Sequence, residues 1–135
     1  MAETRDLIGG LDLNPPATEE EICACMESLP GELPAGYVAF LRMANGGDGF
    51  VGENAYVILW KCGELAEMNE AYEVKDYAPG LLLFGSDGGG EAFGFDTRDA
   101  DWPIVQVPFI GMGWRYAKPC GKSFAGFLEW LGQVD

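Results

Sequence analysis

Apolar residues recur with the period of an α-helix in four segments of the chain: residues 18–28, 33–44, 63–74 and 122–132. The first segment opens with Thr18-Glu19-Glu20-Glu21, which fits a capping box because Thr18 and Glu21 can each accept a backbone N–H of the other. The second begins around Pro34 and is followed by Asn45-Gly46-Gly47, where glycine can take the left-handed conformation that ends a helix. These patterns predict four amphipathic helices.

Extended segments are predicted at residues 50–51, 55–60, 81–85, 92–96 and 104–109. Turn-forming residues separate the last three, at residues 86–90 and 97–101. Connections this short join antiparallel neighbours, because a parallel crossover needs a dozen or more residues. We therefore expect one α+β domain over residues 1–135, with its core at about 19–131, in which helices pack on one face of a mostly antiparallel sheet.

The apolar positions of these elements predict the core. Hydrophobic residues make up 48% of the 135 residues, enough to bury a sizeable interior. We expect burial of fourteen side chains: Tyr37, Phe40, Leu41, Trp60, Leu82, Phe84, Phe93, Phe95, Val105, Val107, Phe124, Phe127, Leu128 and Leu131. Trp102, Trp114 and Trp130 are left outside this set, as candidates for partly exposed contacts with a partner.

The chain is strongly acidic, with 22 acidic and 8 basic residues and a net charge of -14. Nucleic acids and anionic membranes are therefore not expected as partners, since both bind through lysine and arginine. A basic protein would be attracted, although the same charge could serve solubility alone. No apolar run approaches the ~20 residues that span a bilayer, and the first six residues lack a signal-peptide pattern. We expect a cytoplasmic protein of undetermined oligomeric state.

Candidate chemistry is scarce. The sequence has no histidine, which excludes Ser-His and Cys-His nucleophiles within this chain, and it has no phosphate-binding, dinucleotide-binding or EF-hand motif. Its cysteines, Cys23, Cys25, Cys62 and Cys120, lack the paired spacing of a zinc site. We expect free thiols, and we assign no catalytic residue, metal or cofactor.

Asp87, Glu91 and Asp96, around Gly88-Gly89-Gly90, are the one group that could act on a substrate. Against this, Glu91 and Asp96 are five residues apart and would face opposite sides of a strand, and Asp87 suits a turn. The three glycines fit either a wide hairpin turn or a loop whose exposed amides contact a partner or a small anion. The same two interpretations apply to residues 45–49.

Residues 33–41 followed by Asn45-Gly46-Gly47 look like the "LPxxYxxFLxxxNGG" opening of the SUKH superfamily. Residues 84–98 resemble the central glycine-rich strand-turn-strand of that family, which ends in Phe-Asp. Residues 104–110 and a final helix beginning with Ser123-Phe124 complete the order, so that the resemblance covers about residues 19–131. Ala35 and Gly36 depart from the pattern, because polar residues are commoner there, but they precede the core stripe.

The resemblance implies an α+β domain that acts by binding protein. The superfamily includes bacterial immunity proteins that neutralise toxins delivered between cells, and a fungal regulator of cell-wall synthesis. The implied function is a non-catalytic immunity protein bound to a toxin domain. The alternatives are a carboxylate-based enzyme or small-ligand domain and a general regulatory scaffold.

Loops are the natural place for recognition on a packed scaffold, because they vary without disturbing the core. The glycine-rich loops and the next connection present six acids as candidate binding residues for a basic toxin domain: Asp48, Glu53, Asp87, Glu91, Asp99 and Asp101. Whether these acids converge on one side is left open by the sequence.

Overall fold

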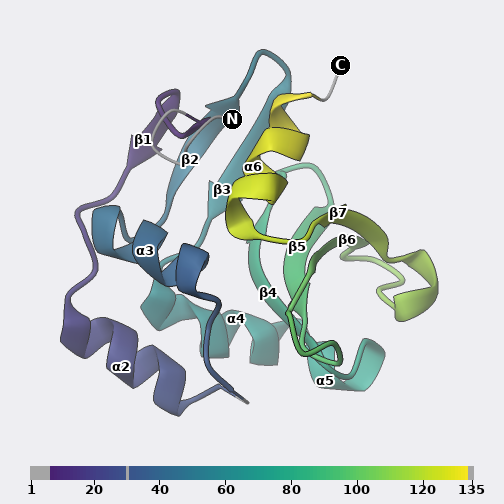
Figure 1. Ribbon diagram of the computed structural model, residues 1–135. Coiled ribbons are helices and arrows are strands. Elements are labelled where there is room, and N and C mark those ends of the chain that lie inside the picture. Colours follow the sequence, from purple (N-terminus) through teal and green to yellow (C-terminus); the bar gives the residue numbers. More distant parts are fainter. Residues whose placement is uncertain (1–6, 30, 134–135) are drawn as a thin grey trace.

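A computed structural model describes residues 7–29 and 31–133 and contains a seven-stranded antiparallel sheet whose strands follow chain order from β1 to β7 (Figure 1). The strands are β1 (Leu11–Leu13), β2 (Gly47–Val51), β3 (Ala55–Leu59), β4 (Leu81–Ser86), β5 (Glu91–Asp96), β6 (Ile104–Pro108) and β7 (Lys118–Gly121). Every neighbouring pair is antiparallel, so each connection leads to the adjacent strand. The predicted α+β class and antiparallel meander are confirmed.

Helices α2 (Glu19–Glu27), α3 (Ala35–Met43), α4 (Leu65–Ala71), α5 (Val74–Tyr77) and α6 (Phe124–Gly132) accompany the sheet, with 3-10 turns η1 (Cys62–Glu64) and η2 (Trp114–Tyr116). In Figure 1, α3 and α6 lie in front of the sheet, whereas α2, α4 and α5 gather towards its lower end. The capping box at Thr18 is present, with the Glu21 amide donating to the Thr18 hydroxyl and the Thr18 amide donating to the Glu21 carboxylate.

Two local expectations were wrong. The helix predicted over residues 63–74 is divided, because Glu73 takes a left-handed conformation (φ 54°) between α4 and α5. Helix α3 ends at Ala44 in an extended conformation, so a left-handed C-cap does not stop it. Gly46 is needed for a different reason: a Cβ there would lie 2.3 Å from the Leu59 carbonyl oxygen, and its φ is 80°.

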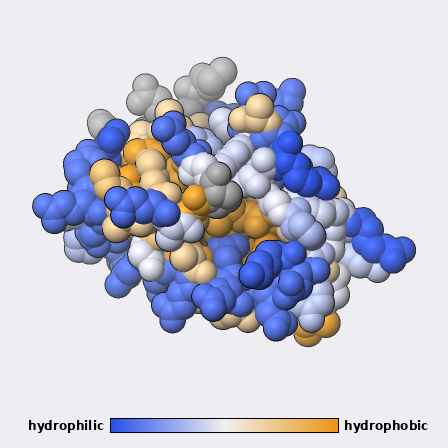
Figure 2. Space-filling model, turned by 90° about the horizontal axis from the view of Figure 1, so that it is seen from below, coloured by the Kyte–Doolittle hydropathy of each residue, from blue (hydrophilic) through white to orange (hydrophobic). Residues whose placement is uncertain are grey.

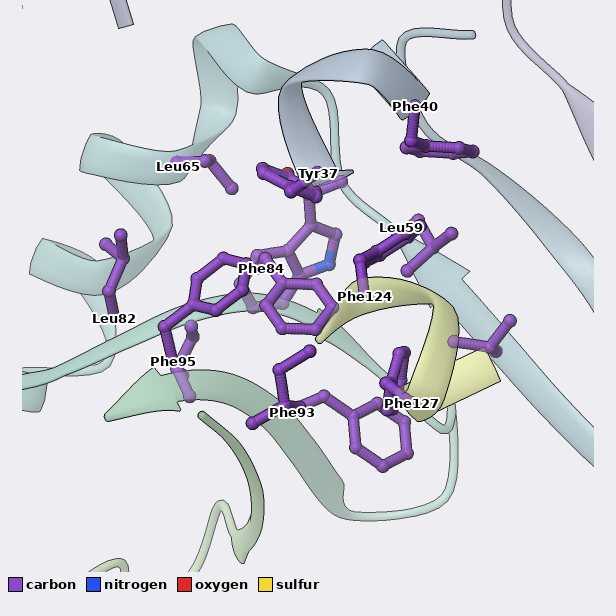
Figure 3. Close-up of a cluster of buried hydrophobic side chains, with 14 of the residues drawn as sticks. Tyr37, Phe40, Leu59, Leu65, Leu82, Phe84, Phe93, Phe95, Phe124 and Phe127 are labelled. Carbon is purple, nitrogen blue, oxygen red and sulfur yellow. The ribbon is translucent and has the colours of Figure 1, made fainter. Parts of the chain in front are cut away.

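The core lies between the sheet and the helices. All fourteen side chains expected to be buried are buried. Figure 3 shows aromatic rings from α3, β4, β5 and α6 meeting there. Tyr37 lies 5.5 Å from Phe84 and 5.3 Å from Phe124, and Phe84 lies 5.4 Å from Phe127, measured between ring centroids. Residues far apart in the chain are thus joined by rings at the separations that aromatic pairs prefer.

The two halves of the sheet are covered differently. Along β3, buried and half-buried residues alternate, as they do when only one face of a strand is packed. All six residues of β4 are buried, and so are the four central residues of β5, which requires cover on both faces. The connection between β6 and β7 supplies this cover for β4–β6.

That connection runs from one end of the strands to the other. The Phe109 amide donates to the Gly90 carbonyl, and further along the Trp114 indole N–H donates to the Pro79 carbonyl. Between these anchors the Met112 side chain is only 6% exposed and belongs to the core. Residues 109–117, which we call the covering loop, therefore close the second face of β4–β6.

The halves meet at a short junction. β3 pairs with β4 only at Ile58–Ser86 and Leu59–Gly85. Beyond this pairing, the Asn69 side chain of α4 takes the place of a strand: its amide donates to the Leu83 carbonyl, and its oxygen accepts the Leu83 amide. The Asn69 amide also donates to the Leu65 carbonyl, which fixes its orientation.

Candidate binding surface

The six candidate acids divide between two ends of the sheet. Glu53 lies in the β2–β3 turn, and Asp87 and Glu91 lie at the β4–β5 turn, which the antiparallel register places at the same end. Asp48 lies within β2, in the same half of the molecule as Glu53. Asp99 and Asp101 lie in the β5–β6 turn at the opposite end. The structure therefore does not bring all six together.

Asp87 and Asp96 both have structural roles. The Asp87 carboxylate accepts the amides of Gly89 (2.7 Å) and Glu91 (3.0 Å), which closes the glycine-rich turn. Asp96 pairs with Arg98 through two hydrogen bonds of 3.0 and 3.1 Å. These bonds hold the pKa of Asp96 below its usual value. The pair of contacts favours the interpretation of this cluster as structural rather than catalytic.

Glu91 begins β5 and is half-buried. Burial raises the pKa of its carboxyl group, the nearby Asp87 raises it further, and Lys118 lowers it in part. Among the described residues, the ion pairs are Arg42–Glu19 and Arg98–Asp96. None of the six candidate acids is in an ion pair within that part of the chain.

A sheet face lies open beside these acids. On the outer face of β1–β3, Asp12, Asp48 and Ile58 are cross-strand neighbours in one row. Phe50 and Tyr56 are cross-strand neighbours in the adjacent row. Phe50 is 49% exposed, and its ring meets the Tyr56 ring edge-on at 5.3 Å between centroids. The Tyr56 hydroxyl donates to the Asp48 carboxylate (2.5 Å), which raises the pKa of Tyr56. We call these five residues the open face.

The glycine-rich turn borders the open face. A Cβ at Gly88 would lie 3.4 Å from the Tyr56 ring and 3.5 Å from Ile58, and the φ of Gly88 is 76°. A Cβ at Gly90 would meet nothing within 4 Å, so the turn is accessible on that side. The Phe109 amide donates to the Gly90 carbonyl of this turn, and the Phe109 and Tyr72 ring centroids are 4.5 Å apart.

Two hollows lie away from the open face. Asp99 and Asp101 line a groove of about 940 Å³ between the β5–β6 turn, β7 and α6, together with Glu129 and Trp130. A second hollow, of about 860 Å³, lies between α2, α4 and α5, with Leu81 and Leu82 at its base. Figure 2 shows hydrophobic side chains gathered among hydrophilic ones on that side of the molecule.

Sequence reasoning missed the aromatic part of the open face. The sequence predicts that Phe50 and Tyr56 lie on extended segments, but it does not indicate which face of the sheet they occupy. The alternation along residues 55–59 was a signal for one exposed face, but the partner strand was needed to show that Phe50 faces Tyr56. Trp102, Trp114 and Trp130 are partly exposed, as expected.

Three of the four cysteines are buried, and Cys23 is exposed on α2; all four are free. Burial raises the pKa of Cys25 to about 11 and that of Cys120 to about 12. Within residues 7–29 and 31–133, no helix combines the length and apolar character needed to cross a bilayer.

The described residues form an α+β architecture with an antiparallel meander. The model of the SMI1 / KNR4 family (SUKH-1) matches residues 16–130. The chain belongs to this family, as the motifs at residues 33–47 and 84–98 suggested. A comparison with curated proteins found no match.

Proposed function

We propose that this protein is a non-catalytic binding module of the immunity type, which binds a basic toxin domain and neutralises it by occlusion. Family membership supports a role in binding protein. The observation that carries the proposal is a set of acids at one end of the sheet, Glu53, Asp87 and Glu91, with Asp48 in the same half of the molecule; none of them is in an ion pair among the described residues. Surface carboxylates that are not held in ion pairs attract a cationic partner and orient it during encounter.

The enzyme alternative has less support. Asp87 closes a turn and Asp96 holds Arg98, so two of its three carboxylates already have structural partners. We expect neither the parent nor the triple variant with alanine at Asp87, Glu91 and Asp96 to show hydrolytic activity. A glycosidase or phosphoesterase activity that is present in the parent and absent from this triple variant would contradict the proposal.

Growth rescue tests the function directly. The toxin candidate encoded beside this gene is expressed alone and together with this protein. Growth restored by co-expression, with a stable complex on size-exclusion chromatography, is the expected result. Capture of several endogenous proteins without rescue would instead indicate a regulatory scaffold.

Salt dependence tests the role of the acids. Raising the ionic strength from low to physiological should slow association, because the screening length falls to about 8 Å. Amides at Asp87 and Glu91 should slow association at low salt more than they speed dissociation, as rim charges usually do. Amides at Asp99 and Asp101, at the opposite end, are the matched control. If neither salt nor either pair of amide substitutions changes the association rate, the negative charge serves solubility and does not steer a partner.

A further inference from the structure

The open face combines an exposed aromatic pair with two facing carboxylates. Asp12 and Asp48 are directly opposite each other in the β1–β2 register, and like charges in such positions destabilise a sheet. Neither forms an ion pair within residues 7–29 and 31–133. An unfavourable pair of this kind would be relieved by a cation bound between or above the two carboxylates.

The geometry around Asp48 is ordered in advance. The Tyr56 hydroxyl holds one Asp48 oxygen, Oδ2, and the Tyr56 ring is fixed against Phe50. Asp48 Oδ1 and the Asp12 carboxylate accept no hydrogen bond from the described side chains or backbone. A planar ring beside free carboxylate oxygens suits a guanidinium group, which stacks on aromatic faces and donates in a fork to carboxylates. An ammonium group is more strongly hydrated and gains less from such a site.

We propose that the open face is the docking surface for a basic protein partner and that it receives an arginine side chain of that partner. The guanidinium would lie against Phe50 and Tyr56 and donate to Asp48 and Asp12, while Ile58 and the turn at Gly88 contact the surrounding partner surface. The partner class follows from charge complementarity, because the face carries Asp12, Asp48 and two aromatic rings, and neither acid is in an ion pair among the described residues. This inference rests on the proposed function for the nature of the partner.

Binding of two defined peptides tests the inference. Acetylated hexa-arginine and hexa-lysine are titrated separately into the isotope-labelled protein while its amide resonances are followed by NMR. We expect hexa-arginine to shift resonances of residues 12, 48–50 and 56–58 and to bind at least about threefold more tightly than hexa-lysine, because only guanidinium stacks and forks. Equal affinities, or shifts centred on the Asp99–Asp101 turn, would overturn the proposal.

Matched variants separate this face from general acidity. The pair Asp12→Asn and Asp48→Asn removes the same charge as Asp99→Asn and Asp101→Asn at the other end of the sheet. We expect the first pair to weaken hexa-arginine binding about tenfold and the second by less than about twofold, since the first removes charge-assisted hydrogen bonds to the guanidinium and the second removes only long-range attraction. Phe50→Ala should remove most of the preference for arginine. Equal losses from both pairs would overturn the proposal.

A second copy of the chain is the competing occupant. Sedimentation equilibrium of the parent and of Phe50→Ala examines it: a dimer that Phe50→Ala dissociates would assign the face to self-association and overturn the proposal, whereas a monomeric parent supports it.

Growth rescue distinguishes the docking surface proposed here from the immunity function on which it rests. Rescue that survives Asp12→Asn, Asp48→Asn and Phe50→Ala together would refute the open face as the docking surface and leave the immunity function intact. If no toxin partner is found but hexa-arginine still binds the open face, the immunity function is refuted and the open face remains an arginine-binding surface.

Discussion

Strands β3 and β4 are neighbours in one sheet, yet they are packed in different ways. β3 has one buried face and one face open to solvent, whereas β4 is buried along its whole length. The difference comes from the covering loop, which crosses the second face of β4–β6 between Gly90 and Pro79 and leaves β1–β3 uncovered. One half of the sheet thus provides stability on both faces, and the other leaves a rigid face free for contact.

Two phenylalanines give the largest expected contrast. Phe40 is 1% exposed in the core beside Tyr37 and Phe124, whereas Phe50 is 49% exposed on the open face. Phe40→Ala should lower the free energy of unfolding by about 3–5 kcal/mol, the usual cost of removing a buried ring. Phe50→Ala should cost less than about 1 kcal/mol, as surface changes usually do. Urea denaturation of both variants measures these free energies of unfolding. Similar decreases in the two variants would contradict the assignment of Phe40 to the core and Phe50 to the surface.

The covering loop offers a second matched pair. Met112 is 6% exposed and Ile110, two residues earlier, is 94% exposed. Met112→Ala should lower stability by about 2–3 kcal/mol because it opens a cavity over β4–β6, and Ile110→Ala should change it by less than about 0.5 kcal/mol. Thermal or urea unfolding provides the readout. If Met112→Ala were as mild as Ile110→Ala, the loop would not be what covers this face.

The junction between the halves depends on Asn69. Asn69→Ala leaves the Leu83 amide and carbonyl without their side-chain partner, and we expect a loss of about 1–3 kcal/mol, the cost of unsatisfied buried groups. Glu70→Ala, at the next and exposed position of α4, is the control. Hydrogen exchange at the Leu83 amide should accelerate in Asn69→Ala alone. Unchanged exchange there would show that the contact between α4 and β4 does not need this bridge.

A smaller effect is expected at the end of the covered half, where Arg98 connects Asp96 to the covering loop. The Arg98 guanidinium carbon lies 3.4 Å from the centroid of the Trp114 ring, and its bonds to Asp96 lower the pKa of that carboxyl group. Because the pKa is lower in the folded state, the stabilisation is complete above the usual Asp value of about 3.9 and is lost as the pH falls through the folded-state value. Because the Arg98 side chain is exposed, we expect this pH-dependent stabilisation to be small.

Asp96→Asn tests this by urea unfolding at several pH values. The variant should be less stable than the parent at neutral pH, and the gap should narrow below about pH 3.9 as the parent carboxyl protonates. A gap that is constant with pH would mean that the charge of Asp96 contributes nothing to holding the loop.

The covered half was easier to predict from the sequence than the open half. The continuous run Leu81-Leu82-Leu83-Phe84 and the phenylalanines of β5 and α6 identify buried positions by composition alone, and all those predicted are buried. β1 and β7 were missed, because three residues in one case and a Lys-Pro-Cys-Gly sequence in the other carry little strand propensity. β1 is held by pairing with β2, which lies more than thirty residues further along the chain, and β7 is held by pairing with β6.

The candidate site was predicted in part. Residue type identified Asp87 as a turn former, and the structure confirms it. The separation of Asp99 and Asp101 from Asp87 and Glu91 follows from the predicted meander, because consecutive turns lie at opposite ends of the sheet. The position of Glu53 at the same end as Asp87 could not be predicted, because it depends on the pairing of β3 with β4 across a long helical connection. The break at Glu73 could not be predicted either, because residue type gives no sign that a glutamate will take the left-handed conformation.

The exposed thiol of Cys23 makes this protein convenient to observe. At neutral pH a maleimide dye should attach there first, because the other three thiols are buried and their pKa values are raised. Cys23 lies on α2, and α2 is not among the elements that form the open face. A single fluorophore on that helix would therefore report association and dissociation in real time without occupying the surface assigned to the partner.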